Sequence, residues 1–397
     1  MTKAKLINII DNIIDFLTNG SVIRDNIIYN GHPNFYLKHS KEEFEKELEA
    51  IVKDKESYDR YDLYYYTNYM FKYMLNQYDS HTKMFFTDNK YLPIKIRFID
   101  NVPYIVDCIK TIDKYSGAKI LKINGIEINN IIMEMDKIIC YASNDYLKIM
   151  LEDYLSNSNI IKSLPNINVQ DSIVITTDKG DISFDLDNLE KYKDKSRKQN
   201  YNLEIINNTA VITYNSCSEE EKMIDLINKL NTYNNIKNYI VDLRGNGGGN
   251  SSINKYLVNY LKGKNIVVLC DERVFSSARM CLIDLKNIGA RIIGSNPGTP
   301  ISCFGNCVMQ QNFDDMNLRV NGSATYWYYD NNLKCHGIYK GDFEEELRNN
   351  PNLLLPVFLN VDERITLTLD DYVNHTDSVL DYALSTFLNE KNKKSHI

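Results

Sequence analysis

The pattern of apolar and polar residues divides the chain into a helical beginning and a later part rich in short strands. The segment from Met1 to Gly20 places its apolar residues at helical spacing, which predicts an amphipathic helix rather than a signal peptide. Helical patterns also cover Glu43–Lys53 and Tyr58–Tyr78. They end in the turn-forming cluster Asp79-Ser80-His81-Thr82. Residues 1–92 are therefore predicted to form a helical region.

Alternating strand patterns begin after residue 92. Strands are predicted at Ile94–Phe98, Asn101–Val106, within Gly117–Ile128 around an Asn-Gly turn, and at Ile173–Thr177 and Asp181–Leu186, with a helix beginning at Asn129. The polar run Lys191–Asn200 is predicted to be a linker. These elements predict an α+β module over residues 93–200.

In residues 201–397, buried strands alternate with helices. The strands are predicted at Thr209–Thr213, Tyr239–Asp242, Ile266–Cys270 and Arg291–Ile293, and the helices at Glu219–Leu230, Ser252–Leu261 and Ala278–Ile288. Strands that alternate with helices indicate a mostly parallel sheet with right-handed crossovers. The fold class is therefore α/β for this third segment.

Composition narrows the range of functions. The 397 residues carry 46 Lys and Arg against 53 Asp and Glu, a net charge of −7, and contain no basic run, which argues against a nucleic-acid partner. Eight cysteines are scattered without zinc-like spacing, and no apolar run reaches the ~18 residues that span a bilayer. We therefore expect a cytoplasmic protein without a membrane partner, metal or cofactor.

Glycines cluster in one place. Although the chain has only 17 glycines, four of them lie between Gly245 and Gly249, at the carboxyl end of a predicted strand. Glycines there allow positive φ angles and let successive N–H groups bind an anion. A tight turn is the simpler interpretation, and a Walker A phosphate loop is disfavoured because no Gly-Lys-Ser/Thr follows. Asp242 and Arg244 are expected to brace this loop.

A serine follows the next predicted strand. Ser276 comes shortly after Ile266–Cys270, at the first turn of the helix that follows this strand, where the nucleophile of many hydrolases lies. An ordinary helix N-cap is the simpler interpretation of this serine taken alone.

Together, the glycine loop and Val274-Phe275-Ser276-Ser277-Ala278 resemble motifs of the C-terminal processing (tail-specific) serine peptidase family. Further landmarks of that family are similar to Ile292–Thr299, Val361–Thr368 and Asp377–Leu380. The resemblance covers about residues 201–390 and extends more weakly to Gly117–Ile128. It implies a crotonase/ClpP-like catalytic domain, a PDZ-like α+β module and an N-terminal helical region, with Ser276 as nucleophile.

The resemblance also indicates the general base. One branch of the family places a lysine about 25 residues after the serine, where this chain has Pro300, Ile301 and Ser302. The branch represented by tricorn protease and the chlamydial protease-like activity factor uses a histidine from a D-x-H or S-H motif, which His81 matches. A histidine needs little tuning to accept a serine proton at neutral pH. A capping or buried turn histidine is the simpler alternative.

In this branch of the family, a glutamate orients the histidine as the third member of a catalytic triad. This chain has no matching glutamate at that position. Counting back to the position of the family's glutamate leads to Leu355, so Ser80 and Glu346 are left as candidate orienting groups. For Glu346, the solvated face of a short helix is the simpler interpretation, and His336 is expected to be a surface loop residue. A tetrahedral intermediate needs backbone donors, for which Gly247, Gly248 and Ser277 are the candidates.

Two functions from different classes follow from these residues. The first is a serine endopeptidase that acts on a peptide or protein, to which the PDZ-like module presents a strand edge. The second is a non-catalytic protein on the same scaffold that binds peptides or apolar ligands, which the missing glutamate favours. Acyl-CoA chemistry of the crotonase type is a weaker third, because it needs no nucleophilic serine. The cleavage specificity and any homo-oligomer are left open.

Overall fold

The computed structural model describes residues 1–75, 79–193 and 199–394, with side chains as far as residue 387. The chain forms two compact units, of which the first comprises 1–193 and 302–356 and the second 194–301 and 357–397. The sequence predicts one segment over residues 201–397, whereas the structure groups residues 302–356 with the beginning of the chain. The end of the predicted helix Tyr58–Tyr78, at residues 76–78, lies outside the described residues, as does the middle of the predicted linker, at 194–198.

The second unit is built on a six-stranded sheet. The strands, in spatial order, are β10 (Asn202–Ile206), β11 (Thr209–Thr213), β12 (Asn238–Asp242), β13 (Asn265–Cys270), β14 (Arg291–Gly294) and β20 (Glu363–Arg364). The pairing of β10 with β11 is antiparallel, and all the others are parallel. The four predicted strands are confirmed within a residue at each end, and so is the parallel sheet.

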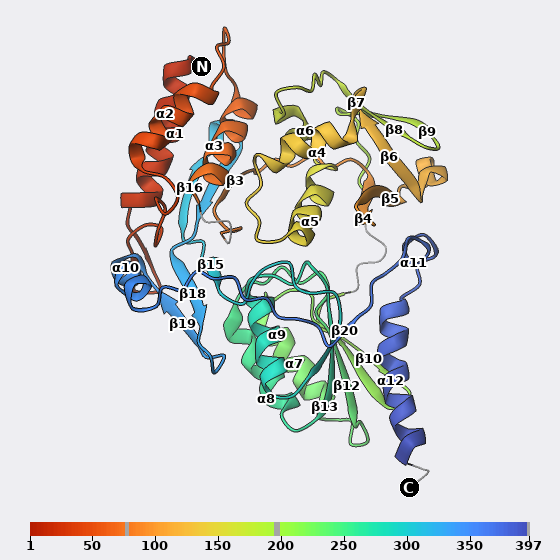
Figure 1. The fold of residues 1–397 in the computed structure, drawn as a ribbon. Helices are drawn as coiled ribbons and strands as arrows, with labels where there is room; N and C mark the ends of the chain where they lie inside the picture. The colour runs from red at the N-terminus through yellow and green to blue at the C-terminus, as the bar shows by residue number, and fades with distance from the viewer. Residues whose placement is uncertain (76–78, 194–198, 395–397) are drawn as a thin grey trace. The chain divides into compact units, whose positions relative to one another are not determined.

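Helices cover both faces of this sheet (Figure 1). One face carries α7 (Glu220–Leu230), the 3-10 turn η2 (Ser251–Ile253), α8 (Asn254–Leu261) and α9 (Ser277–Asn287), and the other carries α12 (Ser378–Lys394), which follows α11 (Leu369–Asn374). In β12, the Val241 side chain packs in the apolar core under α7, α8 and α9, and the Ile240 side chain packs in the core under α12. Because successive side chains alternate between faces, strands buried on both faces are apolar throughout.

In the first unit, residues 93–193 form an antiparallel sheet with one 3-10 helix and three α-helices. The strands are β4 (Ile94–Ile99), β5 (Val102–Cys108), β6 (Ala118–Ile123), β7 (Ile126–Glu127), β8 (Ser172–Thr177) and β9 (Gly180–Asp185). The helices are η1 (Lys110–Tyr115), α4 (Ile128–Asp136), α5 (Asn144–Tyr154) and α6 (Ser158–Ser163). Asn124 and Gly125 have φ angles of 46° and 78° in the turn between β6 and β7, as the Asn-Gly pair predicts.

The prediction that residues 1–92 are helical is only partly right. Three helices are present, α1 (Lys3–Asn19), α2 (Lys41–Ile51) and α3 (Arg60–Met74), but so are strands β1 (Val22–Arg24), β2 (Ile27–Tyr29) and β3 (Lys83–Phe86). Strand β3 pairs with a strand more than 230 residues away, which local periodicity cannot reveal. The partner segment contains β15 (Cys303–Gly305), β16 (Met309–Phe313), η3 (Asp314–Met316), β17 (Leu318–Gly322), β18 (Thr325–Tyr329), β19 (Cys335–Ile338) and α10 (Lys340–Asn349).

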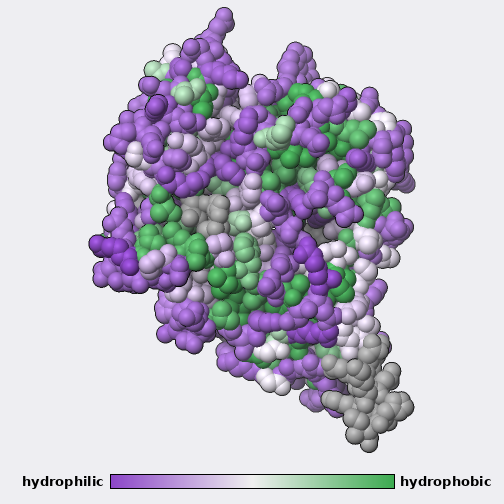
Figure 2. Space-filling view, in the orientation of Figure 1, coloured by the Kyte–Doolittle hydropathy of each residue, from purple (hydrophilic) through white to green (hydrophobic). Residues whose placement is uncertain are grey.

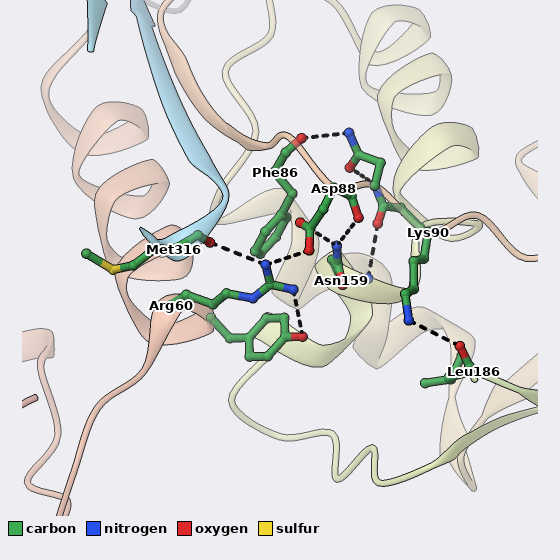
Figure 3. Close-up of polar contacts among 10 residues, drawn as sticks. Arg60, Phe86, Asp88, Lys90, Asn159, Leu186 and Met316 are labelled. Carbon is green, nitrogen blue, oxygen red and sulfur yellow. Dashed lines mark hydrogen bonds and ion pairs between the residues drawn. The ribbon is translucent and has the colours of Figure 1, made fainter. Parts of the chain in front are cut away.

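A polar cluster joins the parts of the first unit (Figure 3). Arg60, at the start of α3, donates to the Asp88 carboxylate at 2.8 Å and to the Met316 carbonyl at 3.3 Å. The Asn159 amide of α6 donates to the Asp88 carbonyl at 3.0 Å, and Lys90 donates to the Leu186 carbonyl at 3.4 Å. The N-terminal helices, residues 302–356 and the α+β module are therefore held together by side chains as well as by the apolar core.

The surface face drawn in Figure 2 is mainly hydrophilic, with several apolar patches. Large exposed apolar side chains include Ile23 and Ile28 of the β1–β2 hairpin. Among the described residues, no helix has both the length and the apolar character that crossing a bilayer requires.

Candidate functional site

Ser276 lies in a sharp turn between β13 and α9. Its backbone angles are φ 52° and ψ −125°, in a region that residues other than glycine rarely occupy. Its hydroxyl caps no N–H group of α9, so the interpretation as an ordinary N-cap does not hold. Strain of this kind costs about 1–3 kcal/mol and is concentrated at functional sites. In α/β-hydrolases, a serine on a strained strand-to-helix turn is the nucleophile.

The glycine loop packs directly against this turn. Gly248 has a φ of 99°, and a Cβ atom at this position would lie 2.7 Å from the Cβ of Ser276 and 2.8 Å from the Ser277 nitrogen. The Phe275 N–H donates to the Asn246 carbonyl at 3.0 Å, which ties the two segments together. Glycine is therefore required at 248 both for its backbone angle and for the space it leaves.

The predicted oxyanion donors differ in their hydrogen bonds. The Gly248 N–H donates to the Oδ1 atom of Asn246 at 2.9 Å. The N–H groups of Gly247 and Ser277, by contrast, donate to no acceptor among the described residues. All three belong to the same unit as Ser276, and the structure brings Gly248 and Ser277 together with it. Their role as oxyanion donors remains a prediction.

A buried network of polar side chains packs against the glycine loop and holds it in place. Asn246 and Asn254 are fully or almost fully buried. The Asn246 amide donates to the Tyr214 carbonyl at 2.8 Å, and the Asn254 amide donates to the Ser277 carbonyl at 2.8 Å. The Tyr214 hydroxyl lies 2.9 Å from the Asn254 side-chain oxygen, to which it donates. Buried networks whose members are all paired make a backbone rigid.

The expectation that Asp242 and Arg244 brace the loop agrees with the structure. The Arg244 guanidinium donates to both oxygens of Asp242 and to both oxygens of Asp377, at 2.7–2.8 Å. Burial opposes its charge, but the two carboxylates together raise the pKa of Arg244 well above its usual value. The Gly245 N–H donates to Asp271, whose pKa is raised by burial. These contacts anchor the start of the glycine loop to the residue that follows β13 and to the residue that precedes α12.

His81 lies in the first unit, in the turn that precedes β3. Its backbone N–H donates to Oδ1 of Asp79 at 3.0 Å, and so does the N–H of Thr82. A Cβ atom on Gly305 would lie 3.6 Å from Cε1 of the His81 ring, so β15 packs beside the imidazole. Because Ser276 belongs to the second unit, the pairing of His81 with Ser276 remains a prediction.

The remaining candidates are also in the first unit. Ser80 is buried, and among the described residues its hydroxyl has no hydrogen-bond partner. Glu346 lies on the exposed face of α10, where its carboxylate contacts no described residue through a hydrogen bond or ion pair. His336 is exposed, as expected, but it belongs to β19 rather than to a loop and lies 3.1 Å from Asp330.

Sequence reasoning missed two residues around His81. His32 lies 2.8 Å from the Asp79 carboxylate, and the Ser323 hydroxyl donates to the other carboxylate oxygen at 2.9 Å. The signal for His32 is weak: it is one of six histidines and lies between a glycine and a proline. Ser323 has no signal, because its role depends on the long-range pairing of β3 with β17. No group of three or more His, Cys, Asp or Glu side chains suited to a metal ion occurs in the described part of the chain.

Comparison with known proteins links the glycine loop to a family. Residues 208–254 match the model of peptidase family S41, and this segment includes β11, α7, β12 and the whole glycine loop. No curated protein matches the chain in sequence.

Solved structures extend the likeness to the whole fold. Mature CPAF complexed with lactacystin is similar over 98% of this chain and 99% of its own, at 10% identity and a TM-score of 0.61. A second structure of mature CPAF covers 94% of each chain, at 10% identity and a TM-score of 0.58. The photosystem II D1 C-terminal processing protease is 8% identical over 94% of this chain and 97% of its own, with a TM-score of 0.46. The match of residues 208–254 to peptidase family S41 confirms the resemblance to that family, and the likeness to CPAF shows the mixed α/β fold.

Proposed function

We propose, from the match of residues 208–254 to peptidase family S41, that the chain is a serine endopeptidase with Ser276 as nucleophile and His81 as general base. The observation that carries the proposal is the backbone of Ser276, which has a φ of 52° against the backbone of Gly248. A turn held in this conformation presents the hydroxyl at the N-terminus of α9, where developing negative charge is stabilised.

The reaction would follow the acyl-transfer scheme of serine peptidases. The Ser276 oxygen forms a bond to the carbonyl carbon of the peptide while its proton passes to His81. Collapse of the tetrahedral intermediate breaks the C–N bond, and His81 returns the proton to the leaving amine. A water molecule then hydrolyses the acyl-enzyme by the same two steps. The substrate class is accordingly a peptide or protein.

The oxyanion would be bound by backbone N–H groups. Gly247 and Ser277 have N–H groups that donate to no acceptor among the described residues, and Gly248 has its N–H on the Asn246 side chain. A donor of this kind contributes about 3–4 kcal/mol to the transition state. We assign the oxyanion site to Gly247, Gly248 and Ser277, with the Gly248 N–H shared between Asn246 and the substrate.

Of the two candidate orienting groups, Ser80 has the stronger support. It precedes His81 and its buried hydroxyl has no partner among the described residues, whereas Glu346 is exposed. A hydroxyl can accept a hydrogen bond from an imidazole, but it supplies no charge to stabilise the imidazolium. A site that relies on Ser80 alone would therefore need a negative charge from elsewhere.

The α+β module at residues 93–193 would act as a PDZ-like peptide-binding region in a cytoplasmic protein. Its edge strand β4 is already partly occupied, because the Phe98 N–H donates to Glu152 of α5 at 2.9 Å. A peptide that adds to this edge by β-augmentation would compete with Glu152 at that position.

Labelling by a fluorophosphonate probe tests the proposal. The wild-type chain should be labelled and should cleave a casein substrate, whereas Ser276→Ala should do neither and should unfold at nearly the same temperature. Ser218→Ala, which changes an exposed serine of the same unit, is the matched control and should behave like the wild type. Equal labelling of Ser276→Ala would overturn the assignment. A wild-type chain that is neither labelled nor active would favour the non-catalytic binding protein.

A further inference from the structure

The carboxylate of Asp79 is a buried hub of hydrogen bonds in the turn that carries His81. Its Oδ1 atom accepts from the N–H groups of His81 and Thr82, both at 3.0 Å, and from the hydroxyl of Ser323 at 2.9 Å. Its Oδ2 atom lies 2.8 Å from Nε2 of His32. Asp79 is fully buried. A carboxylate that accepts from so many donors is held in its charged form.

The hydrogen bonds of His32 determine which of its ring nitrogens carries the proton. Its Nδ1 atom accepts from the backbone N–H of Asn34 at 3.1 Å, so the proton is on Nε2 and is donated to Asp79. The ring stacks on Phe304 with centroids 4.9 Å apart, and its edge meets Phe35. A neutral His32 therefore leaves one net negative charge in this cluster.

Two thiols, those of Cys140 and Cys307, interact electrostatically with Asp79. Burial raises the pKa of the Cys140 and Cys307 thiols to about 12, so both are neutral near pH 7. Lys83 is half-buried at the start of β3 and interacts electrostatically with both thiols. The charge of His81 lowers the pKa of Asp79. Because this attraction is mutual, the carboxylate in turn favours the protonated imidazole.

We propose that Asp79 and His32 are positioning residues for His81: they fix the backbone of the turn at 79–82 and supply the buried negative charge that stabilises the His81 imidazolium. This inference rests on the proposed function, in which His81 takes the proton of Ser276. Asp79 acts on His81 through the backbone and through its charge. It thereby supplies the charge that Ser80 cannot.

The direct test is the titration of the His81 ring, which does not depend on catalysis. Histidines labelled with 13C at Cε1 are followed by NMR between pH 4 and 9, and His81→Gln assigns the signal. In Asp79→Asn the midpoint for His81 should fall by about one pH unit. An unchanged midpoint in a folded Asp79→Asn variant would overturn the proposal. The fold is checked by the emission of Trp327, the single tryptophan, which packs on Gly305 beside His81.

Kinetics provide the second readout. In Asp79→Asn, kcat should fall by about 10- to 100-fold, within the ~10²–10⁴-fold that a general base contributes, while KM changes less than about threefold. The acid limb of the pH–rate profile should move to lower pH together with the NMR midpoint. Absence of activity in the wild type would refute the proposed function alone, since the NMR result still decides the role of Asp79.

Variants of His32 keep the proposal testable if Asp79→Asn fails to fold. His32→Gln retains an N–H donor for Asp79 and should keep most of the wild-type kcat, whereas His32→Leu should lose about 10-fold or more. His39→Gln is the matched control, because His39 stacks on Tyr73 and has no contact with Asp79. Equal kcat values and His81 midpoints in His32→Leu and the wild type would contradict a role for His32.

Discussion

The backbone of Gly248 is in contact with Ser276, so closely that a Cβ atom on Gly248 would lie 2.7 Å from the Cβ of the serine. The two residues come from loops that follow neighbouring parallel strands, β12 and β13. The carboxyl ends of such strands form the usual binding crevice of an open α/β sheet. The contact therefore fixes the distance between the proposed nucleophile and the proposed oxyanion loop.

Gly248→Ala should damage the site more than Gly245→Ala. Both glycines have positive φ angles, and alanine at either costs about 1–2 kcal/mol of backbone strain. Only at position 248 does the added methyl group meet backbone atoms, whereas nothing lies within 4 Å at 245. We expect the rate of fluorophosphonate labelling to fall by about 100-fold in Gly248→Ala and by less than about fivefold in Gly245→Ala. Similar losses in the two variants would contradict the importance of the contact.

Replacing Ser276 by glycine should stabilise the fold relative to alanine. The angles φ 52° and ψ −125° strain any residue with a Cβ atom, but glycine adopts them readily. We expect Ser276→Gly to have a free energy of unfolding about 1 kcal/mol higher than that of Ser276→Ala, measured in urea. The comparison uses two inactive variants, so a change in activity does not enter. If alanine were the more stable of the two, the turn would not be strained.

Asp79 should make the free energy of unfolding depend on pH in the acid range. Burial opposes its ionisation, but hydrogen bonds from His32 and Thr82 outweigh it and hold the pKa of Asp79 below its ordinary value. At pH values above about 4, the ordinary pKa of an aspartate in the unfolded chain, the charged carboxylate therefore stabilises the folded state. This contribution is lost as the pH falls through the pKa of Asp79 in the folded protein.

Urea unfolding of the wild type and Asp79→Asn at several pH values tests this expectation. The difference in free energy of unfolding should be largest above about pH 5 and should shrink between about pH 4 and pH 2. A difference that stays constant over this range would show that Asp79 has an ordinary pKa in the folded protein.

Arg244→Lys should destabilise the second unit. Lysine keeps the charge but cannot bind Asp242 and Asp377 with paired N–H groups, so about 1–3 kcal/mol of unfolding free energy should be lost. Lys286→Met is the control, because the Lys286–Asp362 pair is more exposed and should contribute about 0–1 kcal/mol. Equal losses in the two variants, measured by urea unfolding, would contradict a bracing role for Arg244.

The second unit was predictable because its signals are local. Each strand is a short apolar run, and glycine and serine mark the turns that follow β12 and β13, so the segments around Gly248 and Ser276 could be identified from the sequence. The strained backbone of Ser276 could not, since serine is also a common N-cap residue.

The environment of His81 could not be predicted, because it depends on pairing between distant parts of the chain. The turn at 79–82 is visible in the sequence, but its partners His32 and Ser323 lie 47 and 244 residues from Asp79. Loop closure over such distances leaves no periodic signal near His81. The strand β3 was missed for the same reason.

The long-range pairing of β3 with β17 also bears on how the protein is made. The turn that carries His81 receives its hydrogen bonds from Ser323 and its neighbouring strand from Leu318–Asn321. Chains grow on the ribosome from the N-terminus at about 5–20 residues per second. Ser276 is therefore synthesised well before the turn around His81 can be completed. Under the proposed function, a nascent chain that already contains Ser276 would still lack the completed turn around His81, and it would not yet be able to cleave other chains.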